Sequence, residues 1–217
     1  MQAIKLLSLL FCLFLIFSCE QDKDSISSSS EVSSDTVTID FPMEIGSRWR
    51  YSIIDTVIDI YTHNFEVLYD TVDVKIIDTI VLPNGNIAKA WQYQFSDRID
   101  SIFVAQSVDT LYFYNGKRPA ILFPLAILFP LEVGKEWQIS VLDYKVFLQD
   151  TLFSPAGLFT DVFQIKEYST EGNTMGTNDY FIIPKIGIVG YKYGIIVTVS
   201  PINHKSEWQL LSYNVIN

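Results

Sequence analysis

The chain has 217 residues, of which 49% are hydrophobic and 18% are charged, and its formal net charge is −10. This length suits one domain or two small ones, and the apolar content excludes a wholly disordered chain. An acidic chain is a poor ligand for a phosphate backbone, so we expect no nucleic-acid partner.

The N-terminus begins with a short apolar run. Lys5 is followed by 12 consecutive apolar or small residues, Leu6 to Phe17, and acidic residues come soon after. A membrane-spanning helix needs about 20 apolar residues, so this run is too short to span a bilayer. A short apolar run after a basic start predicts a secretory signal peptide.

The end of this run, Leu15-Ile16-Phe17-Ser18-Cys19, resembles the lipobox of bacterial lipoproteins, although Phe17 stands where the commonest pattern has a small residue. The resemblance implies a lipoprotein signal peptide over residues 1–18 and acyl chains, such as palmitate, attached at Cys19. An ordinary signal peptide with an incidental cysteine is the alternative. Two or three acyl chains would hold the protein stably on a membrane, whereas one chain binds reversibly. The only other cysteine, Cys12, would leave with the signal peptide, so we expect no disulfide and no thiolate metal site.

Residues 19–37 are rich in serine and acidic residues, which predicts a flexible tether. The acids that follow Cys19 resemble the signal that sends lipoproteins of the Bacteroidota to the cell surface, although Lys23 interrupts them. We therefore expect a lipid-anchored protein of the outer membrane, and both the cell surface and the periplasmic face stay open.

Residues 38–217 predict an all-β domain. Val72, Val74 and Ile76 alternate with polar residues, as in a half-buried strand, and the sequence Pro-Asn-Gly-Asn at 83–86 is typical of a hairpin turn. The sequence indicates about ten to twelve antiparallel strands with at most one short helix.

One motif occurs twice in this domain. The sequence FPMEIGSRW begins at Phe41, and FPLEVGKEW begins 88 residues later at Phe129. Proline ends strand pairing and glycine allows a tight turn, so each copy should introduce a strand that begins at tryptophan. An internal repeat of 41–128 and 129–217, forming two related half-sheets, is one interpretation. The other is a turn that recurs without duplication.

The stretch AILFPLAILFPL, residues 120–131, is a tandem repeat of six residues. Its prolines exclude a central strand. It either fills the core as an irregular segment or forms an exposed apolar lip for a partner, which would present Phe123 and Phe129.

The chain resembles uncharacterised bacterial lipoproteins that carry a lipobox, a tether and a β-domain opening FP-L-x-x-G-x-x-W-x-Y. Two further motifs of these proteins occur as PAGLF at 155–159 and IPKIGIVGY at 183–191. The resemblance implies a strongly curved sheet or half-barrel and no established activity.

Motifs that carry catalysis or bind cofactors are not found in the sequence. Its two histidines, His63 and His204, lack the spacing of a metal site, and repeated Asp-Thr pairs lack the spacing of a calcium loop. No phosphate-binding, dinucleotide-binding or serine-hydrolase motif occurs. We expect no metal, no cofactor and no catalytic residue.

Alternating aromatic residues are the best candidates for a binding surface. Trp91, Tyr93 and Phe95 should share one face of a strand, where they either pack the core or hold a ligand. The leading hypothesis is a non-enzymatic, lipid-anchored binding or structural module with a protein, glycan or lipid partner. The alternatives are a carrier for an apolar ligand in a half-barrel cleft, and a hydrolase with an unrecognised Asp/Glu pair.

Overall fold

A computed structural model describes residues 39–59, 61–115, 125–140, 142–169, 174–197 and 202–216. The chain divides into two units, Met1–Asp35 and Thr36–Asn217, and every described residue belongs to the second unit. Cys19 and the tether therefore lie outside the described residues, and the lipid anchor stays a prediction. The described part contains no helix that is long and apolar enough to cross a membrane.

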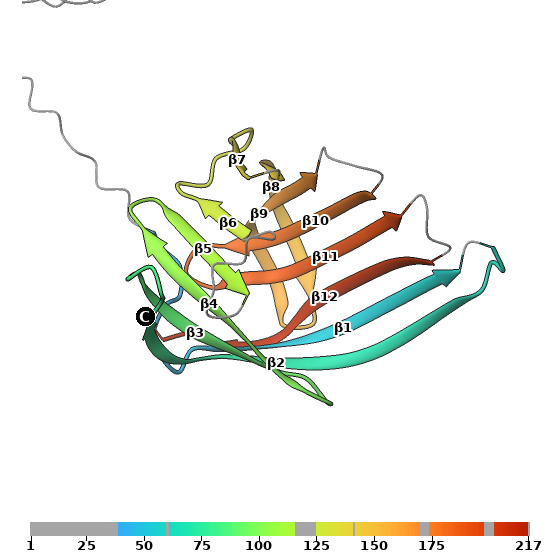
Figure 1. Cartoon of the computed structure of the whole chain (residues 1–217), viewed down its shortest axis with the longest axis horizontal. Helices are drawn as coiled ribbons and strands as arrows, with labels where there is room; N and C mark the ends of the chain where they lie inside the picture. Colours follow the sequence, from blue (N-terminus) through green and yellow to red (C-terminus); the bar gives the residue numbers. More distant parts are fainter. Residues whose placement is uncertain are drawn as a thin grey trace, which may run out of the picture. The chain divides into compact units, whose positions relative to one another are not determined.

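The described residues form one antiparallel sheet of twelve strands (Figure 1). The first six strands are β1 (Arg48–Asp59), β2 (Phe65–Val81), β3 (Ile87–Gln94), β4 (Ile99–Ser107), β5 (Thr110–Asn115) and β6 (Leu125–Leu128). The last six are β7 (Glu136–Ile139), β8 (Leu142–Ser154), β9 (Gly157–Ser169), β10 (Thr174–Ile183), β11 (Gly187–Val197) and β12 (Ile202–Asn214). The prediction of an all-β antiparallel fold is confirmed.

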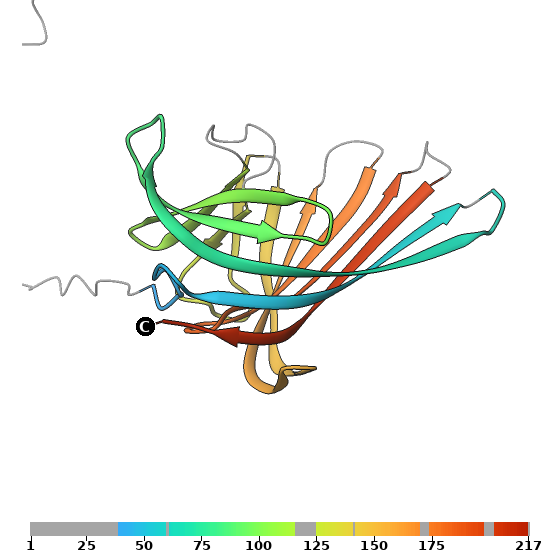
Figure 2. The ribbon, with the colours of Figure 1, turned by 90° about the horizontal axis from the view of Figure 1, so that it is seen from below.

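Strands that are consecutive in the chain pair with each other, except β6 and β7, and the first and last strands also pair. The order is β6-β5-β4-β3-β2-β1-β12-β11-β10-β9-β8-β7, so β1 and β12 join two half-sheets of six strands. Figures 1 and 2 show that the sheet is strongly curved. It is nearly closed and barrel-like, with β6 and β7 as its two edge strands. The predicted curvature is therefore confirmed.

The two edge strands are linked by a side chain. The indole Nε1 of Trp137 on β7 donates a hydrogen bond of 3.0 Å to the carbonyl oxygen of Ala126 on β6. Trp137 also stacks on Tyr144 of β8, with ring centroids 5.5 Å apart and planes 7° apart. This tryptophan spans a seam where the sheet has no backbone ladder between the described strands.

Both copies of the repeated motif fold into the same turn. Ser47 N donates to Glu44 O at 3.1 Å in the first copy, and Lys135 N donates to Glu132 O at 3.0 Å in the second. The glycine of each copy, Gly46 or Gly134, has a positive φ of 98° or 90°. The N–H of Gly46 donates to the carbonyl oxygen of Ile76 on β2 at 2.9 Å, and the N–H of Gly134 donates to that of Val146 on β8 at 2.8 Å. The two copies of the motif therefore form the same turn, while the duplication of whole half-sheets stays a prediction.

One end of the curved sheet is filled by packed side chains. The ring of Phe41 lies 6.2 Å from that of Trp91 in the first half-sheet and 6.4 Å from that of Phe129, and a Cβ at Gly187 in the second half-sheet would lie 3.6 Å from the Cζ of Phe41. Trp49 is 1% exposed, stacks on Trp91 at 4.8 Å, and donates from Nε1 to the carbonyl of Ile186 at 2.6 Å. The predicted alternation in β2 is also present, because Val72, Val74 and Ile76 are all buried in this core.

The second copy of the AILFPL repeat belongs to this packed end. Ala126 and Ile127 are buried in the edge strand β6, and Phe129 and Leu131 are buried in the segment that follows. This agrees with the core-filling interpretation for residues 125–131. Phe123, in the first copy, lies outside the described residues.

Candidate functional site

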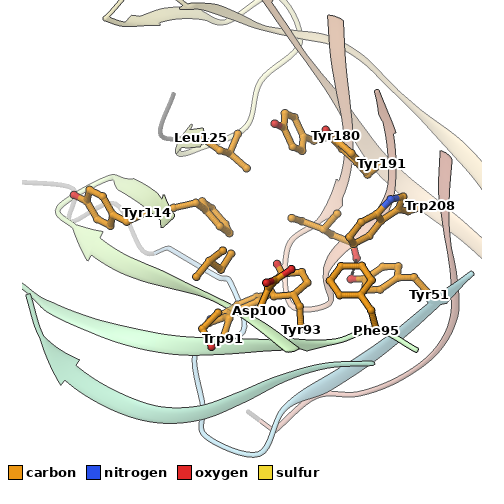
Figure 3. Close-up of a pocket in the computed structure, with 14 residues that line it drawn as sticks. Tyr51, Trp91, Tyr93, Phe95, Asp100, Tyr114, Leu125, Tyr180, Tyr191 and Trp208 are labelled. Atoms are coloured by element: carbon orange, nitrogen blue, oxygen red, sulfur yellow. Dashed lines mark hydrogen bonds between the residues drawn. The ribbon is translucent and has the colours of Figure 1, made fainter. Parts of the chain in front are cut away.

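The other end of the sheet encloses a cavity of about 640 Å³ (Figure 3). Its floor belongs to the packed end, since Trp91 and Phe113 line the cavity and also contact the buried ring of Phe41. The volume falls within the range of about 300–1,000 Å³ that is typical of sites for small molecules.

Nine of the fourteen lining residues are aromatic. The five tyrosines are Tyr51, Tyr93, Tyr114, Tyr180 and Tyr191. The other four rings belong to Trp91, Trp208, Phe95 and Phe113. The rest of the wall is Ile102, Leu125, Ile188, Ser101 and Asp100. A ligand in this cavity would therefore contact mainly ring faces and edges, with a few hydroxyl groups among them.

Strand alternation and register bring the rings together. Tyr180 pairs with Tyr191 across β10 and β11, and Tyr191 pairs with Trp208 across β11 and β12. The ring centroids of these two pairs are 5.2 Å and 5.8 Å apart. Figure 3 shows Tyr114 on the opposite side of the cavity from this row.

Trp208 is the centre of the aromatic wall. Tyr51, Tyr93, Phe95 and Tyr191 all lie within 5.8–6.4 Å of it between ring centroids, in tilted or edge-to-face arrangements. Edge-to-face packing of this kind fixes the ring orientations and adds about 0.5–1.5 kcal/mol per pair beyond area burial. The wall is thus held in place before any ligand arrives.

The tyrosine hydroxyls of the wall differ in their partners. Tyr51 Oη donates to the carbonyl of Ile188 at 2.7 Å, whereas Tyr93 Oη has no hydrogen-bond partner within the described part of the chain. Burial raises the pKa of both phenols, so both are neutral near pH 7. The indole Nε1 of Trp91 is also buried without a partner among the described residues. The Tyr93 hydroxyl is therefore free to bond a polar group of a ligand.

A buried polar network lies behind Tyr180 and Tyr191. Glu167 on β9 is 7% exposed and accepts hydrogen bonds from Asn178 Nδ2 and, at 3.3 Å, from Tyr180 Oη. Tyr191 Oη donates to Asn178 Oδ1 at 2.7 Å. Burial raises the pKa of Glu167, and hydrogen bonds from Asn178, Tyr144 and Tyr180 partly offset that effect.

The aromatic residues proposed from the sequence lie in two places. Trp91, Tyr93 and Phe95 line the cavity, although Trp91 is only 2% exposed and also packs the core. Phe129 is buried in the packed end and does not line the cavity. Trp91 and Tyr93 of β3, and Phe95 directly after it, thus line the cavity and also pack against the core, so both interpretations left open by the sequence apply.

The other half of the wall was not predicted from the sequence. Tyr180, Tyr191 and Trp208 come from three C-terminal strands, and Tyr51 comes from β1. The alternation of Tyr191 and Tyr193 was the available signal, but it does not show which residues of other strands lie opposite.

The cavity wall holds no pair of carboxylates, and no metal-binding cluster is found among the described residues. Asp100 is the one carboxylate among the lining residues, and its Oδ2 is 3.1 Å from Arg98 Nε. No group of three or more His, Cys, Asp or Glu side chains within the described ranges could hold a metal ion. The pair required by the hydrolase alternative is thus not assembled by the described cavity wall.

Comparison with known proteins gives similarity to solved structures only. No family model matches the chain, and no curated protein matches it. A candidate exported protein with a YmcC-like fold from Bacteroides fragilis is 12% identical, with a TM-score of 0.46, over 80% of this chain and 98% of its own. A candidate lipoprotein from Parabacteroides distasonis is also 12% identical, with a TM-score of 0.42, over 82% of this chain and 99% of its own.

Proposed function

We propose that the protein is a non-enzymatic binding module of the bacterial cell envelope that holds a small, largely apolar ligand in its aromatic cavity. The observation that carries this proposal is the cavity of about 640 Å³ with nine aromatic rings in its wall. Apolar surface transferred from water to such a wall contributes about 25 cal/mol per Å². The fixed orientation of the rings lowers the entropic cost of binding.

The lining favours a ligand with few polar groups. Most tyrosine hydroxyls of the wall point to protein partners, such as Ile188, Asn178 and Glu167, and this leaves few free hydrogen-bonding groups for the ligand. Recognition of a sugar by hydrogen bonds needs several free polar groups, because each ligand hydroxyl loses water on entry. This distribution supports the carrier hypothesis over a glycan-binding one.

The sequence supports the location of the module. Residues 1–18 resemble a lipoprotein signal peptide, and Cys19 would carry the acyl chains that attach the protein to the outer membrane. Fractionation of cells that produce the protein with Cys19→Ser tests this part. We expect the variant to leave the membrane pellet, and a variant that remains there after a high-salt wash would contradict the anchor.

Mass spectrometry of organic extracts from natively purified protein tests the binding proposal. We expect a co-purified apolar compound from the wild-type protein and its loss from Trp208→Ala, which removes the centre of the wall. Tyr61→Ala is the matched control, because Tyr61 is 76% exposed outside the cavity. An extract without any such compound, together with no binding of a neutral fluorescent apolar dye, would contradict the proposal.

A further inference from the structure

A polar row follows the aromatic row on the inner face of the sheet. Trp208 pairs with Tyr191 and Ile53; Trp208 and Tyr191 line the cavity, and Ile53 is buried in the core. The neighbouring row, two residues further along each strand, is continuous across five strands. It consists of Glu167, Asn178, Tyr193, Ser206 and Asp55. Because side chains alternate between faces, both rows point to the same side of the sheet.

This polar row is acidic. It contains the carboxylates of Glu167 and Asp55 and no lysine or arginine. Glu167 forms no ion pair among the described residues, and its neighbours are the neutral side chains of Tyr144, Asn178 and Tyr180. An ionised carboxylate that is buried without a cation is costly, and a positive ligand nearby would lower that cost.

The lysines of these strands occupy the other face. Lys192 is on β11 next to Tyr191, and its Nζ lies 3.3 Å from Glu207 Oε1. Lys166 is next to Glu167, and its Nζ lies 3.9 Å from the ring centroid of Phe147. Because successive side chains of a strand point to opposite faces of the sheet, both lysines point away from the cavity. The inner face of β9–β12 therefore holds the buried carboxyl group of Glu167 and no lysine.

Aromatic rings next to a negative charge form a suitable site for an organic cation. A ring face attracts a cation within about 6 Å of its centroid, most strongly for tryptophan, and cages of such rings recognise quaternary ammonium groups. Tyr180, Tyr191 and Trp208 form one continuous wall, and Glu167 bonds directly to the hydroxyl of Tyr180.

We propose that the cavity selects a ligand that combines an apolar part with an ammonium group, bound by the rings of Tyr180, Tyr191 and Trp208 with Glu167 as the supporting negative charge. This inference rests on the proposed binding function and names its ligand class. The apolar part would fill the floor near Trp91 and Phe113. The positive head would lie against the rings of Tyr180 and Tyr191, whose hydroxyl groups bond to Glu167 and Asn178 of the polar row.

Calorimetric titration with four probes that share one tail tests the proposal. Octyltrimethylammonium, 1-octanol, octyl glucoside and octanoate are added to the folded protein below their aggregation concentrations. We expect the ammonium probe to bind about tenfold more tightly than octanol, and octanoate to bind most weakly. Equal binding of octanol and the ammonium probe would overturn the inference and leave the binding function intact. Tightest binding of octyl glucoside would also overturn the inference. Binding of none of the four would overturn the proposed function itself.

Substitution of the carboxylate separates charge from shape. Glu167→Gln should lower the affinity for the ammonium probe about tenfold and leave the affinity for octanol unchanged. Glu207→Gln is the matched control, because Glu207 lies on the opposite face and pairs with Lys192. If Glu167→Gln does not fold, Asp55→Asn on the same row should lower the ammonium affinity in the same direction by a smaller factor. An unchanged preference in the variant that folds would overturn the role of the acidic row.

Discussion

The packed end and the cavity end of the sheet use the same residue types for different purposes. At the packed end, Phe41, Trp49 and Phe129 are at most 7% exposed, and their rings fill the space between the half-sheets. At the cavity end, the rings of Tyr180, Tyr191 and Trp208 line a space of about 640 Å³. An aromatic-rich strand therefore does not by itself indicate a core or a binding site. Its rings form a core where side chains from the opposite part of the sheet pack against them, and a cavity wall where they do not.

The largest expected effect is on stability at the packed end. Trp49→Ala removes a buried ring, its stack on Trp91 and its hydrogen bond to Ile186, and it should lower the free energy of unfolding by about 3–5 kcal/mol. Urea denaturation measures this loss. Trp208→Ala, at the half-buried cavity wall, should cost clearly less. Equal losses at the two positions would show that the cavity wall is as tightly packed as the core.

The repeated turn allows a comparison within the packed end. Gly46→Ala should destabilise more than Gly134→Ala, although both glycines have positive φ. An added Cβ at Gly46 would lie 2.9 Å from Ile216 Cδ1, whereas no atom lies within 4 Å at Gly134. Backbone strain alone costs about 1–2 kcal/mol, so Gly134→Ala should lose about that amount and Gly46→Ala more, as measured by thermal denaturation. The reverse order would contradict the assigned packing of Ile216.

The seam between the half-sheets should respond more weakly. Trp137→Phe keeps an aromatic ring on Tyr144 but removes the hydrogen bond to Ala126, which should cost about 1 kcal/mol. In this variant, the rate of backbone amide hydrogen exchange should rise in β6 and β7 and stay unchanged in β1 and β12. A uniform rise in exchange across the sheet would show that this indole does not hold the seam locally.

The smallest expected effect is a pH dependence at the cavity end. The pKa of Glu167 is raised by burial from its ordinary value of 4.5, so the folded state binds this proton more tightly than the unfolded state. The neutral carboxyl therefore favours folding at low pH, and this contribution is lost as the pH rises from about 4.5 through the raised pKa. The tyrosines that face it, Tyr144 and Tyr180, stay neutral in this range because their own pKa values are raised. Denaturation of Glu167→Gln across the same window should lack this loss, and an unchanged slope would contradict the assignment.

Local patterns were enough to predict the fold. The alternation of Val72, Val74 and Ile76 and the turn at residues 83–86 are read within a few residues, and both are present. The repeated motif predicted two tryptophans that begin strands, and both strands begin within one residue of the tryptophan. Such features depend on backbone preference and side-chain period, which neighbouring residues determine.

The cavity could be predicted only in part, because it depends on register between distant segments. Trp91, Tyr93 and Phe95 were found as one face of one strand. Trp208 meets them only because β12 pairs with β1 and the sheet curves back on itself. The importance of Glu167 depends on its burial beside Asn178 and Tyr180, which a count of 25 acidic residues does not reveal.

Nitrogen–proton NMR of the four tryptophan indoles during titration with octyltrimethylammonium tests the central claim most directly. Trp208 and Trp91 line the cavity, whereas Trp137 lies at the seam and Trp49 at the packed end. The account predicts saturable shifts of the Trp208 and Trp91 signals, a smaller shift of Trp49 through its stack on Trp91, and an unmoved Trp137 signal. Four unmoved signals, or the largest shift at Trp137, would contradict a ligand site in the aromatic cavity.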